Sequence, residues 1–212
     1  MTMKKILAFA LVAMMAGSAM AATGWNNSYL YAWDGTADTW YDLNGADQAA
    51  GVFSGVNLGS FDLTTGSLFL NGQLNVWSDE GDVFDAVSII WRVNSGSWTT
   101  TSVDPSNVSG NDYSGTVMGI DLLAAASVGA NTLDVYVERS HTWSGGSYSS
   151  YMGWDTSGPD EVLTEGVDPV TPPSANFFTA SFTGTQAVPE PATMSLLGLG
   201  ALAMVLRRKI RK

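Results

Sequence analysis

Short segments of alternating character, broken about every 8 to 12 residues, fill most of this chain. Glycine, serine, threonine, asparagine and aspartate supply the breaks, and apolar residues recur at every second position between them. A period of two places successive side chains on opposite faces of a strand. The pattern therefore predicts an all-β fold, namely a single β-sandwich with jelly-roll or Greek-key connections. A closed barrel is the alternative.

The strongest local turn signal is Asn71-Gly72, which lies between two alternating runs. It predicts a β-hairpin, because Asn-Gly readily adopts the positive φ angles of a tight turn. A strand is predicted over residues 87–93, followed by a turn at 94–96, and another over 132–138 with Leu133, Val135 and Val137 inward. Weaker strands are expected over residues 28–33, 39–43, 58–63, 113–118 and 148–154. Asp121 is expected to cap one helical turn within residues 120–127.

The first 21 residues have the three-part layout of a secretory signal peptide. Lys4 and Lys5 precede an apolar run over residues 6–16, and Ala19 and Ala21 form an A-x-A cleavage site. We expect cleavage after Ala21. A retained membrane helix is the alternative.

The C-terminal segment, residues 188–212, has three parts. The motif Val188-Pro189-Glu190-Pro191 is followed by an apolar run over residues 192–206 and by five basic side chains over residues 207–212. At about 1.5 Å per helical residue the run spans roughly 22 Å, less than the ~30 Å of a bilayer core. The prolines hold Glu190 in an extended backbone that a protease can bind.

This layout resembles the PEP-CTERM sorting signal. The resemblance implies an exported protein of a biofilm-forming Gram-negative bacterium, handled by the Sec machinery and an exosortase. It implies transient association with the inner membrane through a transmembrane helix over residues 192–206, and delivery to the cell surface or extracellular matrix. An ordinary C-terminal anchor with a basic flank is the alternative, and whether the tail is cleaved or retained stays open.

The region between the two signals, residues 22–187, has the length of one domain. It holds nineteen acidic residues and two basic ones, Arg92 and Arg139, so its net charge is about −17. Such a surface repels nucleic acid, whose phosphates need Lys and Arg. Residues 159–175 are expected to form an acidic, proline-containing linker, and residues 176–184 a last strand that returns to the domain.

Calcium is the one cofactor that the composition suggests. Four acidic residues gather in seven positions just before the strand at residues 87–93: Asp79, Glu80, Asp82 and Asp85. Residues 42–47 offer further oxygen ligands. Ca²⁺ takes six to eight oxygens from such segments, but aspartate and asparagine also favour turns by bonding their own backbone.

Eight tryptophans are more than core packing alone explains. Several lie near turns rich in tyrosine, asparagine, aspartate and serine, a setting that suits stacking on sugar rings. Trp33, Trp143 and Trp154 are the candidate carbohydrate-binding residues. Burial at strand ends is the equally weighted alternative.

No catalytic residue is predicted. His141 is the sole histidine, is expected in a loop just beyond residues 132–138, and is interpreted as structural. The chain has no cysteine and no G-x-S-x-G, H-E-x-x-H or phosphate-loop motif. The leading hypothesis is a non-enzymatic, polysaccharide-associated or adhesive domain that binds exopolysaccharide. The alternative is a secreted polysaccharide hydrolase that uses a carboxylate pair.

Overall fold

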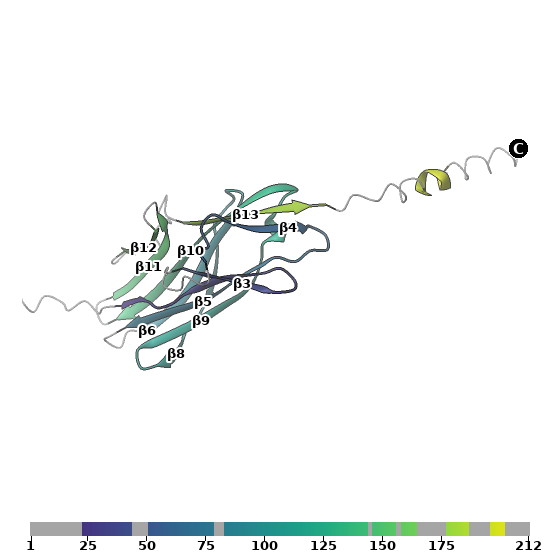
Figure 1. The fold of residues 1–212 in the computed structure, drawn as a ribbon. Coiled ribbons are helices and arrows are strands. Elements are labelled where there is room, and N and C mark those ends of the chain that lie inside the picture. The colour runs from purple at the N-terminus through teal and green to yellow at the C-terminus, as the bar shows by residue number, and fades with distance from the viewer. Residues whose placement is uncertain are drawn as a thin grey trace, which may run out of the picture.

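Two β-sheets face each other in the computed structural model, which describes residues 23–43, 51–78, 83–143, 146–155, 158–164, 177–186 and 196–201 (Figure 1). The first, called the front sheet, has the order β3-β2-β5-β9-β8, with β1 also paired to β5. Its strands are β1 (Thr23–Trp25), β2 (Tyr29–Trp33), β3 (Asp38–Asp42), β5 (Phe69–Ser78), β8 (Ser106–Ser109) and β9 (Asp112–Asp121).

The second, called the back sheet, is built around β10, which pairs with β6, β11 and β13. Its strands are β4 (Val56–Asp62), β6 (Val83–Val93), β7 (Thr99–Val103), β10 (Gly129–Trp143), β11 (Gly146–Asp155), β12 (Gly158–Thr164) and β13 (Phe178–Thr185). One edge of β10 is shared, because β13 pairs with its first half and β11 with its second half. The all-β sandwich expected from the sequence is confirmed.

The hydrophobic core lies between the sheets and follows the predicted alternation. Val87 and Ile89 of β6 and Val135 of β10 are fully buried there. The turn after β6 also forms as expected, since Asn94 and Ser95 both adopt positive φ and the Gly96 amide donates to the Val93 carbonyl. The alternating residues thus bring the two sheets together through one shared apolar layer.

The hairpin predicted at Asn71-Gly72 is wrong, because both residues lie inside the continuous strand β5. Neither has a positive φ. Gly72 is needed instead for a close approach of the two sheets: a Cβ there would lie 2.8 Å from Ile89 Cδ1 of the back sheet. A glycine inside a strand marks such an approach as readily as it marks a turn.

The predicted helical turn is confirmed as the 3₁₀ helix η1 (Leu123–Ala125), on the connection from the front sheet to the back sheet. The Asp121 carboxylate accepts hydrogen bonds from the Leu123 amide at 3.0 Å and the Ala124 amide at 3.2 Å. These bonds satisfy two amides that the short helix leaves without a backbone partner.

The predicted last strand is confirmed as β13, whose Phe178, Ala180 and Phe182 lie in the core. It pairs antiparallel with β10 and parallel with β4. The start of the expected linker differs from the prediction, because residues from Gly158 to Thr164 form β12 against β11. Residues 165–175, which complete that interval, lie outside the described residues.

Candidate functional site: the outer face of the front sheet

The β2–β3 hairpin forms the aromatic end of the front sheet, and its turn is shaped by Asp34. The Asp34 carboxylate accepts hydrogen bonds from the amides of Thr36 and Ala37 at 2.8 and 2.9 Å. Gly35 supplies the positive φ of this turn. The resulting register places Tyr31 of β2 directly opposite Trp40 of β3. Their side chains therefore project from the same face of the sheet.

Aromatic rings cover this end of the outer face. The Tyr31 and Trp40 rings are stacked, with centroids 4.2 Å apart and planes inclined by 21°. Tyr29 meets Trp40 edge-on at 6.0 Å, and Trp33 contacts Phe69 of β5 at 5.7 Å. Trp40 nevertheless keeps 41% of its surface exposed. The cluster therefore holds one tryptophan in a fixed orientation while leaving it accessible to a ligand.

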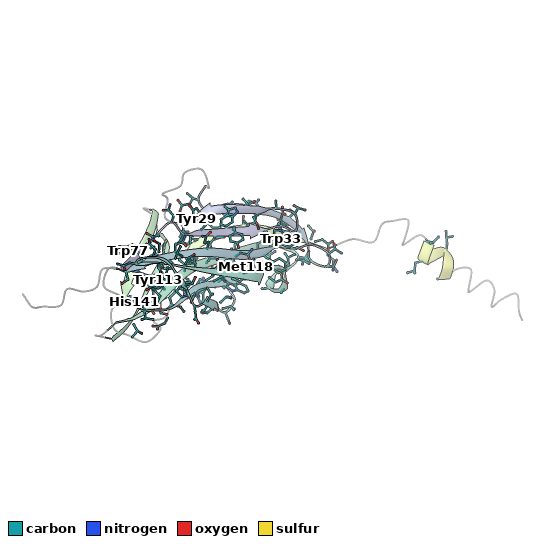
Figure 2. The ribbon with its side chains drawn as sticks, turned by 90° about the horizontal axis from the view of Figure 1, so that it is seen from below. Tyr29, Trp33, Trp77, Tyr113, Met118 and His141 are labelled. Carbon is teal, nitrogen blue, oxygen red and sulfur yellow. The ribbon has the colours of Figure 1, made fainter. Side chains whose placement is uncertain are left out.

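A shallow groove of about 500 Å³ runs over these rings. Trp33 lies at this end of the sheet, as does Met118, which is 68% exposed (Figure 2). The groove is lined by Tyr31, Trp33, Asp38, Trp40, Phe69, Asn71, Met118 and Gly119. We call it the aromatic groove.

A bulge in β9 shapes the floor of the aromatic groove. Met118 and Gly119 lie opposite the single residue Asn71 of β5, and Gly119 adopts a positive φ. Asn71 Oδ1 accepts a hydrogen bond of 2.7 Å from the Gly119 amide. The extra residue of a bulge leaves its amide without a ladder partner, and Asn71 supplies that partner here.

The aromatic groove carries one carboxyl side chain among its lining residues, that of Asp38. Burial and, secondarily, the negative charge of Asp38 raise the pKa of the Tyr31 phenol above its ordinary value. The phenol therefore stays protonated at neutral pH and retains a hydrogen-bond donor.

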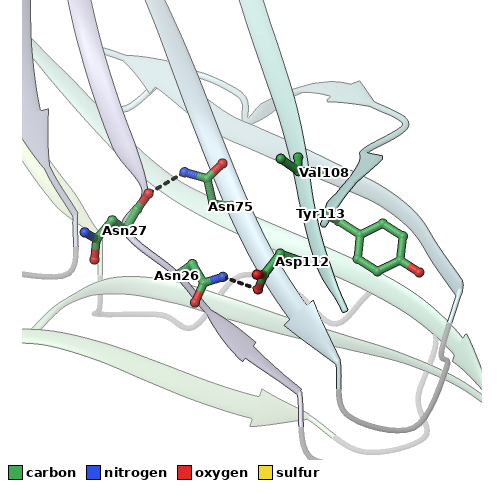
Figure 3. A pocket seen from close by; sticks show the side chains of 6 residues that line it. All are labelled: Asn26, Asn27, Asn75, Val108, Asp112 and Tyr113. Atoms are coloured by element: carbon green, nitrogen blue, oxygen red, sulfur yellow. Dashed lines mark hydrogen bonds between the residues drawn. The ribbon is translucent and has the colours of Figure 1, made fainter. Parts of the chain in front are cut away.

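A second, polar groove of about 380 Å³ lies on the same face near the other end of β5 (Figure 3). Asn26 Nδ2 donates to Asp112 Oδ1 at 2.8 Å, and the Asn75 side-chain amide donates to the Asn27 carbonyl. We call it the amide groove. Its lining residues are Asn26, Asn27, Asn75, Val108, Asp112 and Tyr113.

Both arginines of the domain contact other side chains of the domain. Arg92 forms an ion pair with Asp134 at 2.8 Å on the outer face of the back sheet. Arg139 is fully buried, and its Nε donates to Ser150 Oγ at 2.5 Å. Because residues 22–187 contain no lysine, neither groove has a basic side chain among its lining residues.

The structure separates the three tryptophans predicted to bind carbohydrate. Trp33 pairs with Phe69, at the start of β5. Trp143 is the last residue of β10, in the back sheet. Its neighbour Thr142 pairs with Val83, which follows the end of β5 along the chain, so Trp143 lies at the opposite end of the sandwich from Trp33. Trp154 lies in β11, also in the back sheet. The side chains of Trp143 and Trp154 are outside the described part of the chain, so their role stays a prediction.

Sequence reasoning missed Trp40, Tyr31 and Phe69 as site residues. A signal for them existed, since Asp34-Gly35 lies between two alternating segments and is a hairpin cue like Asn71-Gly72. A hairpin predicted at Asp34-Gly35 would have placed Tyr31 opposite Trp40.

The predicted calcium ligands Asp79, Glu80 and Asp82 lie outside the described residues, as does most of residues 42–47. Asp85 is exposed at the start of β6 and accepts a 2.7 Å hydrogen bond from Thr142 Oγ1. Within the described ranges, no three His, Cys, Asp or Glu side chains form a group that could hold a metal ion. Calcium binding stays a prediction.

His141 lies inside β10 rather than in a loop, so that expectation was wrong. It is buried, and its ring lies 5.8 Å from that of Phe84. The sequence suggested a loop because serine and threonine flank it, yet β10 runs on through these residues, paired with β6 and β11.

The fold and grooves define a β-sandwich domain with an open, aromatic-rich outer face. Residues 187–209 match the family model of the PEP-CTERM protein-sorting motif, which confirms the resemblance seen in the tail. The motif implies an exported protein that an exosortase recognises and processes. A comparison with curated proteins finds none that matches this chain.

Residues 196–201 are helical and fall within the predicted membrane segment, residues 192–206. Among the residues that the structure describes, no helix is both long and apolar enough to cross a membrane. The predicted signal peptide, residues 1–21, and the remainder of the predicted membrane segment lie outside the described residues.

Proposed function

We propose that this chain is a non-enzymatic protein of the cell surface or extracellular matrix of a Gram-negative bacterium, where its sandwich binds exopolysaccharide. The observation that carries the proposal is the Trp40 ring, stacked on Tyr31 and open to solvent on the outer face. The sorting motif supports delivery of this face to the outside of the cell.

The aromatic groove suits a sugar because it combines flat rings with polar groups. The axial C–H groups of a pyranose ring form an apolar face that stacks on an aromatic ring, while its hydroxyls need hydrogen-bond partners. Asp38 and the phenol of Tyr31 lie beside the Trp40 ring and can supply such partners. Binding sites of this kind place a few polar groups around a mainly apolar surface.

A polysaccharide hydrolase is less well supported by the same groove. Glycoside hydrolysis generally needs two carboxyl groups, roughly 5 to 10 Å apart, one on each side of the scissile bond. Asp38 is the one carboxyl side chain among the residues that line the aromatic groove. The neighbouring Asp34 carboxylate is occupied by the amides of its own turn. The groove therefore favours binding over cleavage.

The test is retention of the exported protein in a gel that contains the exopolysaccharide of the producing bacterium. We expect the unaltered protein to be retarded and Trp40→Ala to migrate as in a gel without polysaccharide. Trp98→Ala instead removes a tryptophan that precedes β7 and packs on the outer face of the back sheet, and this variant should remain retarded, with circular dichroism confirming that both variants are folded. Equal retardation of Trp40→Ala would overturn the proposed site, and release of oligosaccharides would favour the hydrolase.

A further inference from the structure

Strand β5 connects the aromatic groove to the amide groove. Its outward-facing residues alternate with core-facing ones: Phe69 and Asn71 line the first groove, and Asn75 lines the second. Asn75 lies four positions after Asn71, so their Cα atoms lie about 13 Å apart along the strand. Trp33 and Met118 lie toward one end of this face, and Trp77 lies toward the other (Figure 2).

The surface between the two grooves also carries side chains that can contact sugars. Gln73 lies midway on β5, directly opposite Tyr29 of β2 on one side and Thr116 of β9 on the other. Tyr29 contacts the Trp40 ring of the aromatic groove, so the rings extend toward the middle of the sheet. Polar side chains capable of bonding hydroxyl groups therefore follow one another along the face.

The two ends offer different chemistry to one ligand. The aromatic groove stacks rings, whereas the amide groove presents the carboxamides of Asn26 and Asn75 beside the Asp112 carboxylate (Figure 3). Val108 borders this groove and is 65% exposed. A single small sugar would use one groove, while a chain of several sugars reaches both.

The charge of the face selects against acidic sugars. Each groove has an aspartate, Asp38 or Asp112, and no basic residue among its lining side chains. The arginines Arg92 and Arg139 are engaged elsewhere, with Asp134 and Ser150. A polyanion would find no cation to pair with and would be repelled by a domain of net charge about −17.

We propose that the two grooves are the ends of one binding track and that its ligand is an extended chain of uncharged sugars lying along β5. This inference rests on the proposed polysaccharide-binding function. It adds the shape and the charge class of the ligand.

The experiment measures affinity by calorimetry for glucose and N-acetylglucosamine oligomers with two to six β-1,4 linked units, and for a mannuronate hexamer. We expect at least tenfold tighter binding of one neutral hexamer than of its dimer. The mannuronate hexamer should bind at least tenfold more weakly than that neutral hexamer. Trp40→Ala should abolish binding of both neutral lengths.

Two variants test the far groove. Val108→Arg places bulk in the amide groove, and Asn26→Ala removes one of its amides; both should reduce the gain in affinity from dimer to hexamer. Val128→Arg is the matched control, because Val128 is similarly exposed at 63% but borders neither groove.

The outcomes separate the two proposals. Binding that depends on Trp40 but does not rise with length, or that is unchanged in both amide-groove variants, overturns the single track and leaves the proposed function standing. Tighter binding of the mannuronate hexamer than of the neutral hexamers overturns the inference that the ligand is uncharged. No binding of any oligomer together with no retention by the native exopolysaccharide overturns the proposed function and the track with it.

Discussion

The Arg92 guanidinium lies over the ring of Trp98, 4.3 Å from its centroid, on the outer face of the back sheet. The Phe177 ring is 5.2 Å from the same guanidinium, and Arg92 Nε bonds Asp134 Oδ2 at 2.8 Å. Arg92 belongs to β6 and Asp134 to β10, while Phe177 immediately precedes β13. The cation therefore links three neighbouring strands on the face that points away from the core.

Trp98→Ala should lower the free energy of unfolding by about 1 to 3 kcal/mol, since it removes a cation–π contact and an aromatic contact with Tyr136. Urea unfolding measures the change. Val83→Ala, at an exposed position of β6, is the control and should stay within about 0.5 kcal/mol. A Trp98→Ala effect no larger than that of the control would show that the contacts of Trp98 with Arg92 and Tyr136 do not stabilise the sheet.

Gly72→Ala should destabilise the domain by about 1 to 3 kcal/mol, because the added Cβ would lie 2.8 Å from Ile89 Cδ1. Ile89→Val removes that methyl group, and alone it should cost about 0.5 to 1.5 kcal/mol. The double variant should therefore lose less stability than the sum of the two single variants, as measured by urea unfolding.

A second glycine provides the control for this cycle. A Cβ at Gly115 would meet Val87 Cγ2 at 2.4 Å and Val103 Cγ1 at 3.0 Å, and Ile89 is not among its nearest neighbours. Ile89→Val should give Gly115→Ala little relief. Equal relief at both glycines would mean that Ile89→Val loosens the whole interface between the sheets rather than one contact.

Sequence reasoning was correct for features that depend on local alternation along one strand. It failed for a feature that depends on the opposite sheet. Val87, Ile89 and Val135 were placed in the core because alternation alone determines which face of a strand they occupy. Asn71-Gly72 was misread because the same dipeptide serves a tight turn or a close approach. Only the position of Ile89 across the core distinguishes the two.

The candidate site was predicted only in part for a similar reason. Trp33 was singled out from composition, but the Tyr31–Trp40 stack depends on the register between β2 and β3. That register follows from the Asp34 turn, which the sequence contains. The amide groove also needs β8 and β9 beside β5, and no local pattern gives that strand order.

Alkaline pH should destabilise the domain through buried tyrosines. Burial, followed by the negative charge of Glu138, raises the pKa of Tyr151 to about 12. Burial also raises the pKa of Tyr136 well above its usual value, with the charge of Tyr151 adding to it. A raised pKa means that this part of the stability is complete below pH 10 and is lost as pH rises toward 12.

Two variants test this assignment by urea unfolding from pH 9 to 12. Tyr151→Phe should make the fall in stability shallower, because one of the groups that lose a proton in this pH range is removed. Glu138→Gln should lower the pKa of Tyr151 and shift the onset of tyrosinate absorbance to lower pH in the folded protein. An alkaline profile identical in all three proteins would remove Tyr151 from the explanation.

Export should remove most of the basic residues of this chain. If the signal peptide is cleaved after Ala21 and the exosortase acts at the motif Pro189-Glu190-Pro191, seven of the nine Lys and Arg residues are lost. Intact-mass measurement of the released protein should then give a product of residues 22 to about 190, with Arg92 and Arg139 as its basic residues.

The matched variants are replacement of Pro189, Glu190 and Pro191 by alanine and, as control, replacement of Pro172 and Pro173 by alanine. The first should retain the C-terminal basic residues in the mass spectrum and keep the protein in the membrane fraction, because the extended peptide that the protease binds is lost. The second should be processed normally. A released product that still carries residues 207–212 would show that the sorting motif does not direct cleavage of this protein.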